Sequence, residues 1–337
     1  MRTEHGDERP IKIMEVCGTH TSSIARNGIA GMFTEGIRLV SGPGCPVCVT
    51  GGAFIDGLIE QSRKENTCVL SFGDLFKVRG AAQSFSEAKA EGGNFGVIYS
   101  PFEALVLAKD NPGVQYILAA VGFETTIPVY ALILESIIEE NIKNIKLATS
   151  LKRMIPAMEF ICEKEEIDGF ICPGHVSVII GEDAYLPLFE QYRKPMIITG
   201  FEPEQIIDSV CSITEQIKSG EPRLLNMLTS VVKKEGNVRA FELTDRYFVP
   251  ADTFWRGIGR IESSALVVKD EFSEFALGGV QETGDELPTG CRCSEVLMGR
   301  ISPPDCRLFG KMCRPDNPVG ACMVSQEGAC GIWINNL

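Results

Sequence analysis

The chain has 337 residues, 13 cysteines, a hydrophobic content of 44% and a formal net charge of −13. This length exceeds what one hydrophobic core usually serves, so we expect more than one domain. The acidity argues against nucleic-acid binding, which needs a basic surface. The polar N-terminus lacks the apolar core of a signal peptide, and no apolar run approaches the ~20 residues that span a bilayer. We therefore expect a cytoplasmic protein whose thiols stay reduced.

Strands and helices are expected to alternate through the first two thirds of the chain. Short apolar runs that end in Gly, Pro or acidic turns predict strands, and helical patterns separate them. The expected strands are residues 13–16, 37–40, 68–71, 97–99, 116–121, 145–148, 169–172 and 196–199, and the expected helices are 53–65, 101–108, 127–140, 151–164, 184–192 and 204–219. This alternation predicts an α/β fold with parallel sheets covered by helices.

An internal repeat suggests two related α/β units. Strand, helix and strand lead to Pro43-Gly44-Cys45 in the first half and to Pro173-Gly174-His175 in the second. Cys45 and His175 would then hold equivalent places at the carboxyl ends of strands, where open α/β sheets bind ligands. Ordinary α/β sequences also reuse Pro and Gly after strands, which is the alternative explanation. The expected domains are residues 1–120, residues 121–225 and a C-terminal domain of residues 226–337 that packs with the N-terminal segment.

Two glycine-rich turns near the N-terminus carry three cysteines. Cys17 lies in Cys-Gly-Thr-His, and Cys45 and Cys48 lie in Gly-Pro-Gly-Cys-Pro-Val-Cys. Glycine lets the backbone come close to a ligand, and proline stiffens its path. A rigid Cys-x-x-Cys turn suits a reversible disulfide or two ligands of one soft metal, with a purely structural loop as the third reading.

Polar residues follow other expected strands. The chain has three histidines, of which His20 and His175 lie in glycine-rich turns. A lone histidine in a turn is more often a hydrogen-bonding residue, but the neighbouring Cys17 favours a functional role for His20. Asp74, Glu124 and Glu202 bring carboxylates to similar turns, whereas Thr125 and Thr126 are expected to cap a helix.

Six cysteines crowd the last 47 residues, at Cys291, Cys293, Cys306, Cys313, Cys322 and Cys330. Their spacing lacks the paired Cys-x-x-Cys knuckles of structural zinc sites, and no histidine accompanies them. Widely spaced thiolates favour a [4Fe–4S] cluster, which takes four of them. The remaining two could form a redox-active disulfide. Zinc remains the alternative, and the spacing does not say which four cysteines bind.

These motifs together resemble the HypD family of hydrogenase maturation factors. The resemblance rests on Cys-Gly-Thr-His, Gly-Pro-Gly-Cys-Pro-Val-Cys, Ser-Phe-Gly-Asp, Val-Gly-Phe-Glu-Thr-Thr, Pro-Gly-His-Val-Ser, Gly-Phe-Glu-Pro and the six-cysteine tail, in order along the chain. It implies assembly of the Fe(CN)2CO unit of [NiFe]-hydrogenases together with a HypC-type small chaperone and a HypE-type cyanide donor. It also implies two α/β domains and a cluster domain similar to the catalytic subunit of ferredoxin–thioredoxin reductase.

The resemblance also implies roles for individual residues. Cys17, Cys45 and Cys48 would be the essential thiols of the assembly site, with Cys45 and Cys48 holding iron transiently. His20 could donate a hydrogen bond to a cyanide nitrogen, and Glu327 matches a functionally important acid. The implied cluster ligands are Cys291, Cys306, Cys313 and Cys330, which leaves Cys293 and Cys322 as a nearby redox pair.

Two other functions compete with a scaffold. One is an iron–sulfur-dependent protein disulfide reductase that acts by turnover, and the other is a zinc-stabilised interaction protein without redox chemistry. Absorption near ~400 nm would exclude the zinc protein, because an iron–sulfur cluster is coloured and zinc thiolates are not. Thiol–disulfide exchange needs contact between sulfurs. We therefore expect the tail to fold against the edge of the α/β units, with Cys293 or Cys322 within reach of the Cys45/Cys48 turn.

Overall fold

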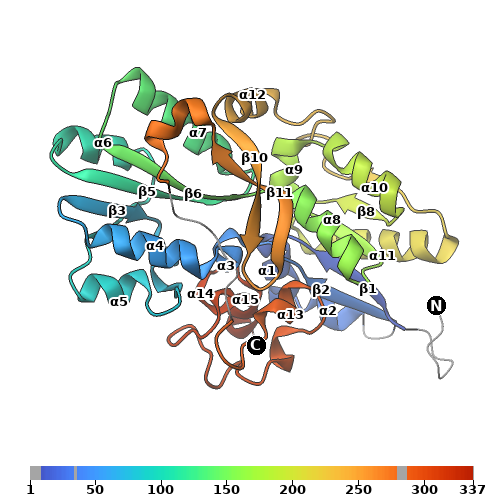
Figure 1. Ribbon diagram of the computed structural model, residues 1–337. Coiled ribbons are helices and arrows are strands. Elements are labelled where there is room, and N and C mark those ends of the chain that lie inside the picture. Colours follow the sequence, from blue (N-terminus) through green and yellow to red (C-terminus); the bar gives the residue numbers. More distant parts are fainter. Residues whose placement is uncertain (1–8, 34–35, 279–286, 337) are drawn as a thin grey trace. The chain divides into compact units, whose positions relative to one another are not determined.

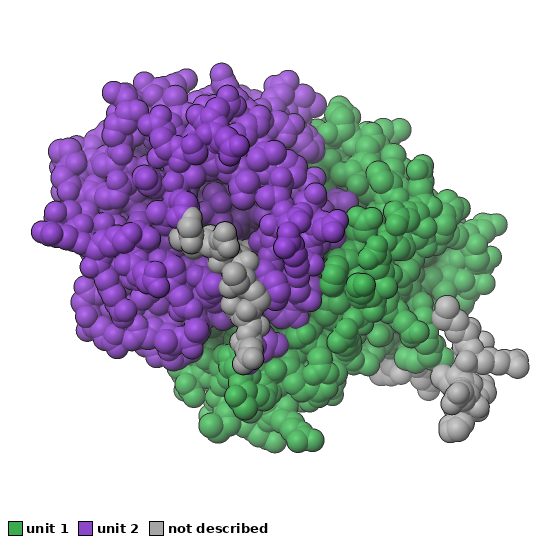
Figure 2. All heavy atoms as spheres, in the orientation of Figure 1, with its two compact units in different colours: residues 1–45, 157–237, 288–337 green, residues 46–156, 238–287 purple. Residues whose placement is uncertain are grey.

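The strands form two sheets, one in each of two units of the computed structural model, which describes residues 9–33, 36–278 and 287–336 (Figure 1). Unit 1 contains residues 1–45, 157–237 and 288–337, and unit 2 contains residues 46–156 and 238–287 (Figure 2). No helix in the described ranges is long and apolar enough to cross a membrane.

Unit 1 holds a five-stranded parallel sheet. Its strands are β1 (Ile11–Glu15), β2 (Ile37–Ser41), β7 (Gly169–Cys172), β8 (Met196–Ile198) and β9 (Leu224–Asn226), in the spatial order β2-β1-β7-β8-β9. Every neighbouring pair is parallel. The carboxyl ends of all five strands therefore share one edge, which we call the carboxyl edge of unit 1.

Helices cover the unit 1 sheet and extend into the C-terminal segment. They are α1 (Gly18–Arg26), α2 (Ile29–Met32), most of α8 (Met154–Lys164), α9 (Gly174–Ile180), η2 (Asp183–Tyr185), α10 (Leu186–Tyr192), α11 (Pro203–Ser219), α13 (Cys293–Leu297), η4 (Pro303–Asp305), α14 (Ala321–Val324) and α15 (Ala329–Asn335). Ile13 and Ile171 of the sheet pack with Ile24 of α1 and with Ile206 and Ile213 of α11. Burial of these side chains fixes where the strand ends lie.

Unit 2 holds a six-stranded mixed sheet in the order β10-β11-β6-β5-β3-β4. Strands β3 to β6 are parallel, whereas β11 is antiparallel to β6 and to β10. The strands are β3 (Thr67–Ser71), β4 (Phe95–Val97), β5 (Gln115–Gly122), β6 (Ile145–Lys152), β10 (Phe248–Trp255) and β11 (Gly259–Val268). The helices are α3 (Pro46–Val49), α4 (Gly52–Ser62), η1 (Gly73–Lys77), α5 (Phe85–Ala90), α6 (Glu103–Asp110), α7 (Ile127–Glu139), α12 (Val238–Tyr247) and η3 (Asp270–Phe275).

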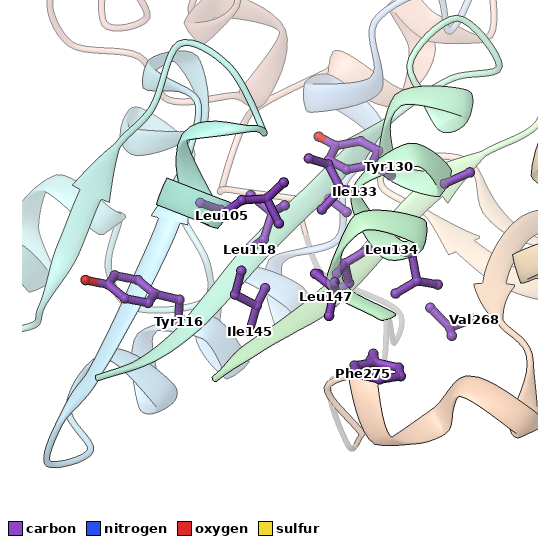
Figure 3. Packing of buried hydrophobic residues seen from close by; sticks show 14 of the residues in the cluster. Leu105, Tyr116, Leu118, Tyr130, Ile133, Leu134, Ile145, Leu147, Val268 and Phe275 are labelled. Atoms are coloured by element: carbon purple, nitrogen blue, oxygen red, sulfur yellow. The ribbon is translucent and has the colours of Figure 1, made fainter. Parts of the chain in front are cut away.

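The core of unit 2 lies between the sheet and helix α7. Leu118 of β5 and Leu147 of β6 belong to one buried cluster with Tyr130 and Leu134 of α7 (Figure 3). Tyr130 and Leu134 are four residues apart, a spacing that keeps two side chains on one face of a helix. The Tyr130 hydroxyl donates to the Val121 carbonyl at 3.3 Å, so the buried phenol is satisfied.

The α/β class and the predominance of parallel strands are confirmed. The expected strands all occur, although the one expected at residues 97–99 is β4 at Phe95–Val97. The helix expected at residues 151–164 begins at Met154 because β6 continues through Lys152. The β10–β11 hairpin lies outside the sequence expectation; its pairing with β6 extends the sheet.

The internal repeat does not correspond to the two units. Strands β1 and β2 are neighbours in one sheet, whereas their counterparts in the repeat, β6 and β7, belong to different sheets. Parallel pairing joins strands that are distant in the sequence, so β1 pairs with β7 and the units are discontinuous. Their boundaries differ from those of the domains expected at residues 120 and 225. Residues 288–337 lie in the same unit as the N-terminal segment.

Candidate functional site

Four chemically distinctive residues follow neighbouring strands at the carboxyl edge of unit 1. Cys45 follows β2, Cys17 follows β1, His175 follows β7 and Phe201 follows β8. These strands are adjacent in the sheet, in that order. The fold therefore gathers two thiols, an imidazole and an aromatic ring along the edge where α/β sheets bind ligands.

A glycine brings the two cysteine turns of this edge together. The Gly42 amide donates to the Glu15 carbonyl at 2.7 Å, which holds the turn after β2 against the end of β1. A Cβ atom on Gly44 would lie 2.6 Å from the Cys17 nitrogen and 2.7 Å from its Cα. Only glycine lets the backbone pass this close. The residue before Cys45 thus lies directly on Cys17.

Cys17 is a buried thiol at the start of α1. Burial raises its pKa to about 11, backbone hydrogen bonds from Thr19 and His20 lower it, and the Glu15 charge raises it. The Glu15 carboxyl accepts from the Cys17 amide at 3.0 Å and from the Thr21 hydroxyl at 2.5 Å. Burial raises the pKa of Glu15 to about 8, against the lowering effect of these bonds. At neutral pH Cys17 is therefore protonated, and a metal ion that bound its sulfur would displace the proton.

His20 is fully buried beneath the same edge. Its Nε2 lies 2.9 Å from the Gly200 carbonyl, and a carbonyl only accepts, so Nε2 carries the proton. Burial lowers the His20 pKa to about 4, which leaves the ring neutral. No described residue bonds to Nδ1. The single N–H of this tautomer therefore points to Gly200. A hydrogen bond from His20 to a cyanide nitrogen stays a prediction.

Phe201 stands between the two histidines of the edge. Its ring centroid lies 4.7 Å from that of His20 and 4.3 Å from that of His175. His175 is exposed, whereas His20 is fully buried. Stacking on Phe201 restricts the His175 ring and keeps its imidazole at the edge.

The second cysteine of the Cys-x-x-Cys turn belongs to unit 2. Cys45 ends the first segment of unit 1, and Cys48 lies in α3, where its side chain is fully buried. The Thr50 hydroxyl donates to the Pro46 carbonyl at 2.9 Å and lies 3.2 Å from the Ser150 hydroxyl, which fixes α3 at the end of β6. The turn thus contains the first point at which the chain passes from unit 1 to unit 2.

Unit 2 has carboxyls rather than thiols after its parallel strands. Asp74 follows β3 and Glu124 follows β5, and burial raises the pKa of both, to about 7 for Glu124. The Glu124 carboxylate accepts from the Met154 amide at 2.7 Å. Of the two threonines expected to cap a helix, Thr126 is the N-cap residue of α7, but its hydroxyl donates to the Phe123 carbonyl and accepts no hydrogen bond from a helix amide. Thr125 precedes the cap and is exposed. Glu202 does cap a helix, α11.

The six cysteines of the tail line one cavity in unit 1. Its wall comprises Cys291, Arg292, Cys293, Val296, Cys306, Leu308, Phe309, Cys313, Gly320, Cys322, Met323 and Cys330, and about 320 Å³ of space lies inside, its mouth included. A Cβ atom on Gly320 would lie 2.6 Å from the Cys291 sulfur, so this glycine gives the sulfur room. The Val319 amide donates to the Cys313 sulfur at 3.4 Å. Thiols that are up to 39 residues apart in the chain therefore face a common space.

Electrostatic coupling links the cysteines of this cavity to one another. Burial raises the pKa of Cys330, and the charges of three others, Cys291, Cys313 and Cys306, raise it further. For Cys293, a hydrogen bond with Cys291 lowers the pKa, while a hydrogen bond with Cys322, burial and the charges of Cys322 and Cys330 raise it well above the usual value. Cys293 is thus coupled to Cys322 and also to Cys291 and Cys330.

The tail packs on the helix that follows Cys17. A Cβ atom on Gly18 would lie 2.7 Å from the Glu327 carbonyl oxygen, and one on Gly328 would lie 2.3 Å from that of Cys322. The Glu327 side chain is exposed. The segment between Cys322 and α15 therefore joins the cysteine cavity to the turn that carries Cys17, within one unit.

All thirteen cysteines lie in the described ranges, and all are free thiols. No three side chains of His, Cys, Asp or Glu among the described residues converge on a point that could hold one metal ion. The tail cysteines line a shared cavity.

Sequence reasoning missed Glu15 and Phe201 as parts of the site. A carboxyl within the apolar stretch Ile-Met-Glu-Val, directly before Cys-Gly-Thr-His, is a signal that could have identified Glu15. Phe201 carried no comparable signal, because its role depends on two histidines that are 155 residues apart in the chain.

Comparison with known proteins gives full-length matches. A family model described as "HypD: Hydrogenase formation hypA family" matches residues 1–336. The chain is 38% identical to the hydrogenase maturation factor HypD of Azotobacter vinelandii, over 98% of this chain and 90% of that protein. It is 39% identical to the hydrogenase expression/formation protein HupD of Azotobacter chroococcum mcd 1, over 96% and 89%. It is 36% identical to the hydrogenase maturation factor HypD of Escherichia coli K12, over 97% and 89%.

Proposed function

This chain belongs to the HypD family of hydrogenase-formation proteins, and we propose that it is the scaffold on which the Fe(CN)2CO unit of [NiFe]-hydrogenases is assembled. One observation carries the proposal. Two buried thiols, Cys17 and Cys45, lie at one sheet edge, and a tail with six more thiols around a cavity packs on α1 in the same unit. Thiols, which are soft metal ligands, are thus concentrated at and near the carboxyl edge of unit 1, where sheets of this kind bind ligands.

Cys17, Cys45 and Cys48 are the residues that would hold the iron substrate. Iron that carries cyanide and carbon monoxide is low-valent and soft, so thiolates suit it. The glycine contact between Gly44 and Cys17 brings the two turns close enough to bind one compact complex. His20 would act as a positioning residue, since its N–H fixes the Gly200 turn and thereby Phe201.

The tail fits a [4Fe–4S] cluster with Cys291, Cys306, Cys313 and Cys330 as its ligands. The shared cavity and the coupling of Cys330 to the other three thiols support a cluster here, while the choice of these four among the six cysteines comes from the family resemblance. Such a cluster supplies one-electron transfer when it is bound. Cys293 and Cys322, which hydrogen-bond each other, would act as a dithiol that forms and opens a disulfide.

Exchange between this pair and the thiols of the sheet edge would couple the two sites. Attack of one thiolate on a disulfide requires contact between sulfurs, and the segment that links Cys322 to Glu327 already lies against Gly18. We propose that a HypC-type chaperone and a HypE-type cyanide donor meet the protein at the Cys17 and Cys45 edge, in the reducing cytoplasm. Glu327 lies at the junction of edge and tail, where its exposed side chain can meet a partner.

The cluster is tested by anaerobic purification followed by visible absorption and by iron and sulfide analysis. We expect absorption near ~400 nm and about four irons per chain. Cys330→Ala should lose both, whereas Cys322→Ala, the matched change in the same cavity, should keep them. A colourless parent protein that contains zinc would exclude the cluster. Iron loss in Cys322→Ala would reassign the ligands.

The scaffold role is tested by infrared spectroscopy of the protein isolated with its chaperone. Bands of iron-bound cyanide and carbon monoxide are expected in the parent and absent in Cys45→Ala and Cys48→Ala, with the ~400 nm absorption kept in both. An alternative function is an iron–sulfur-dependent protein disulfide reductase. The hydrogen bond between Cys293 and Cys322 favours this alternative, because such a reductase needs two neighbouring thiols. Catalytic reduction of a thioredoxin by the protein, without iron capture, would favour that alternative.

A further inference from the structure

A basic loop stands out at the surface of the cysteine cavity. Between Cys306 and Arg314 the chain exposes three cations, Arg307, Lys311 and Arg314, within eight residues. The whole chain carries a formal net charge of −13. We call residues 306–314 the basic loop. Its charge is opposite in sign to that of the protein as a whole.

The three cations are not neutralised within the described part of the chain. None of them takes part in the ion pairs formed by described residues, and the Arg314 guanidinium donates only to the Gly310 carbonyl, at 3.0 Å. Nearby acids are engaged elsewhere: Glu295 pairs with Arg292, and Asp305 pairs with Arg38. Asp316 is the exposed acid that follows the loop, so residues 306–316 keep an excess of two positive charges.

The basic loop is also one wall of the cavity. Cys306, Leu308, Phe309 and Cys313 line the inside, and the cations alternate with them on the exposed side. The loop is held in shape by the Cys313 amide, which donates to the Leu308 carbonyl at 2.9 Å. Two of the cavity thiols are therefore direct chain neighbours of exposed cations. A partner that bound these cations would therefore contact the same loop that lines the cavity.

We propose that the basic loop is the docking surface for an acidic electron-donor protein. This inference rests on the proposed function, because it assumes that the cavity holds a redox group. Each donor molecule would be oxidised by one electron. Two such electrons and two protons convert one Cys293–Cys322 disulfide into two thiols, so the balance closes with two donor molecules for each disulfide.

Charge complementarity selects an acidic partner. Exposed segments with an excess of positive charge attract a negative protein to this acidic chain. Residues 233–239 carry the same excess of two charges, but the basic loop is the one of these two segments that also lines the cavity. Electrostatic steering raises association rates by roughly 10- to 1,000-fold at low salt. Met312, which is 65% exposed between Lys311 and Cys313, adds an apolar contact at the centre. A polarizable methionine flanked by cations suits a small, transient interface.

The test uses an acidic [2Fe–2S] ferredoxin as the probe. Binding of its redox-inactive gallium form to the full chain is measured by titration at several salt concentrations, and reduction by the native reduced form is measured by stopped flow. We expect binding that weakens with salt, and an association rate that falls at least about 10-fold in the Arg307→Glu/Lys311→Glu double variant. The ~400 nm absorption of the double variant should stay that of the parent.

The matched control reverses two exposed lysines elsewhere, Lys64→Glu/Lys218→Glu, with the same change in net charge. It should bind ferredoxin like the parent. Equal weakening in both double variants, or binding that does not depend on salt, would overturn the basic loop as the docking surface. The gallium titration reads binding without electron transfer. A protein that contains no iron therefore contradicts the proposed function, while intact absorption with charge-independent binding contradicts only this inference.

Discussion

The carboxyl edge of unit 1 and the six-cysteine tail present sulfur in different ways. At the edge, Cys17 and Cys45 follow neighbouring strands, and a glycine contact fixes one turn on the other. In the tail the cysteines lie on loops and on helices of four to seven residues around a cavity. Regular structure thus positions the first set. The second set surrounds a space whose contents can hold the loops together.

The comparison shows two relations between a cysteine and the fold. At the sheet edge the fold positions the cysteines, whereas in the tail a group bound by the cysteines can position the chain. Thiols at a sheet edge keep their places when one of them is removed, because strand pairing and apolar packing hold the turns. Thiols around a metal group help to create the structure that carries them, because metal binding and folding are coupled. Replacement of a cysteine at the sheet edge should therefore reduce activity and leave the fold intact. Replacement of a cysteine in the tail should reduce the local folding of the tail.

The largest expected effect is that of metal removal on the tail. Extraction of the proposed cluster's iron with a chelator should lower the hydrogen-exchange protection of amides in α13 to α15 on the order of 100-fold or more, because bound metal contributes to local folding. Protection in β1, β2 and β7 should not change. Hydrogen exchange with mass spectrometry measures both regions in one sample. A tail that stays protected without iron would mean that its own apolar contacts suffice.

Replacement of a sheet-edge thiol should give the reverse result. Cys17→Ser keeps nearly the same shape but replaces a soft ligand with a hard one, so hydrogenase maturation should fall on the order of 100-fold or more. The circular dichroism spectrum and the ~400 nm absorption should remain those of the parent. Cys211→Ser, at an exposed cysteine of α11, is the control and should mature hydrogenase normally. Unfolding of Cys17→Ser would show that this thiol is structural.

The edge of unit 2 offers a third case, with a buried carboxyl in place of a thiol. Burial raises the pKa of Glu124 to about 7, above the ordinary value of 4.5. The protonated form is therefore favoured by folding, and its contribution is complete below pH 4.5 and is lost as the pH rises to about 7. Glu124→Gln should lower the slope of the stability curve in this pH range by at most about 1.4 kcal/mol per pH unit, and the slope that Glu15 contributes should remain.

Urea unfolding of both proteins at several pH values checks the Glu124 prediction. Gln keeps the carbonyl that accepts from the Met154 amide, so the variant isolates the charge. If parent and variant lose stability in parallel between pH 4.5 and pH 7, another group is responsible for the loss.

The smallest effect concerns the glycine that joins the two turns. Gly44→Ala places a methyl group against the backbone of Cys17, which cannot move away easily, and should destabilise unit 1 by about 1 to 3 kcal/mol. Gly31→Ala in α2, with no atom within 4 Å of its Cβ, should instead be neutral or stabilise by up to about 1 kcal/mol. Denaturant midpoints compare the two. Equal midpoints would show that the close approach at Gly44 is not required.

Much of the fold follows from local patterns in the sequence. The apolar runs at residues 37–40, 68–71 and 169–172 predicted strands because burial on both faces of a parallel sheet needs continuous apolar residues. The glycines and prolines after them predicted the turns that carry the cysteines. The β10–β11 hairpin was missed because its exposed positions dilute the apolar signal.

The sequence by itself determined the family, the α/β class and the identity of the unusual residues, because these depend on local composition and spacing. Only the tertiary structure decided which of these residues meet. Pairing of β1 with both β2 and β7 put Cys17, Cys45 and His175 on one edge, although the repeat had assigned Cys45 and His175 to separate units. The bond from His20 to Gly200 fixed the proton on Nε2, and burial set the thiol and carboxyl pKa values. These outcomes depend on contacts between residues far apart in the chain, which strand order and packing determine and local patterns do not.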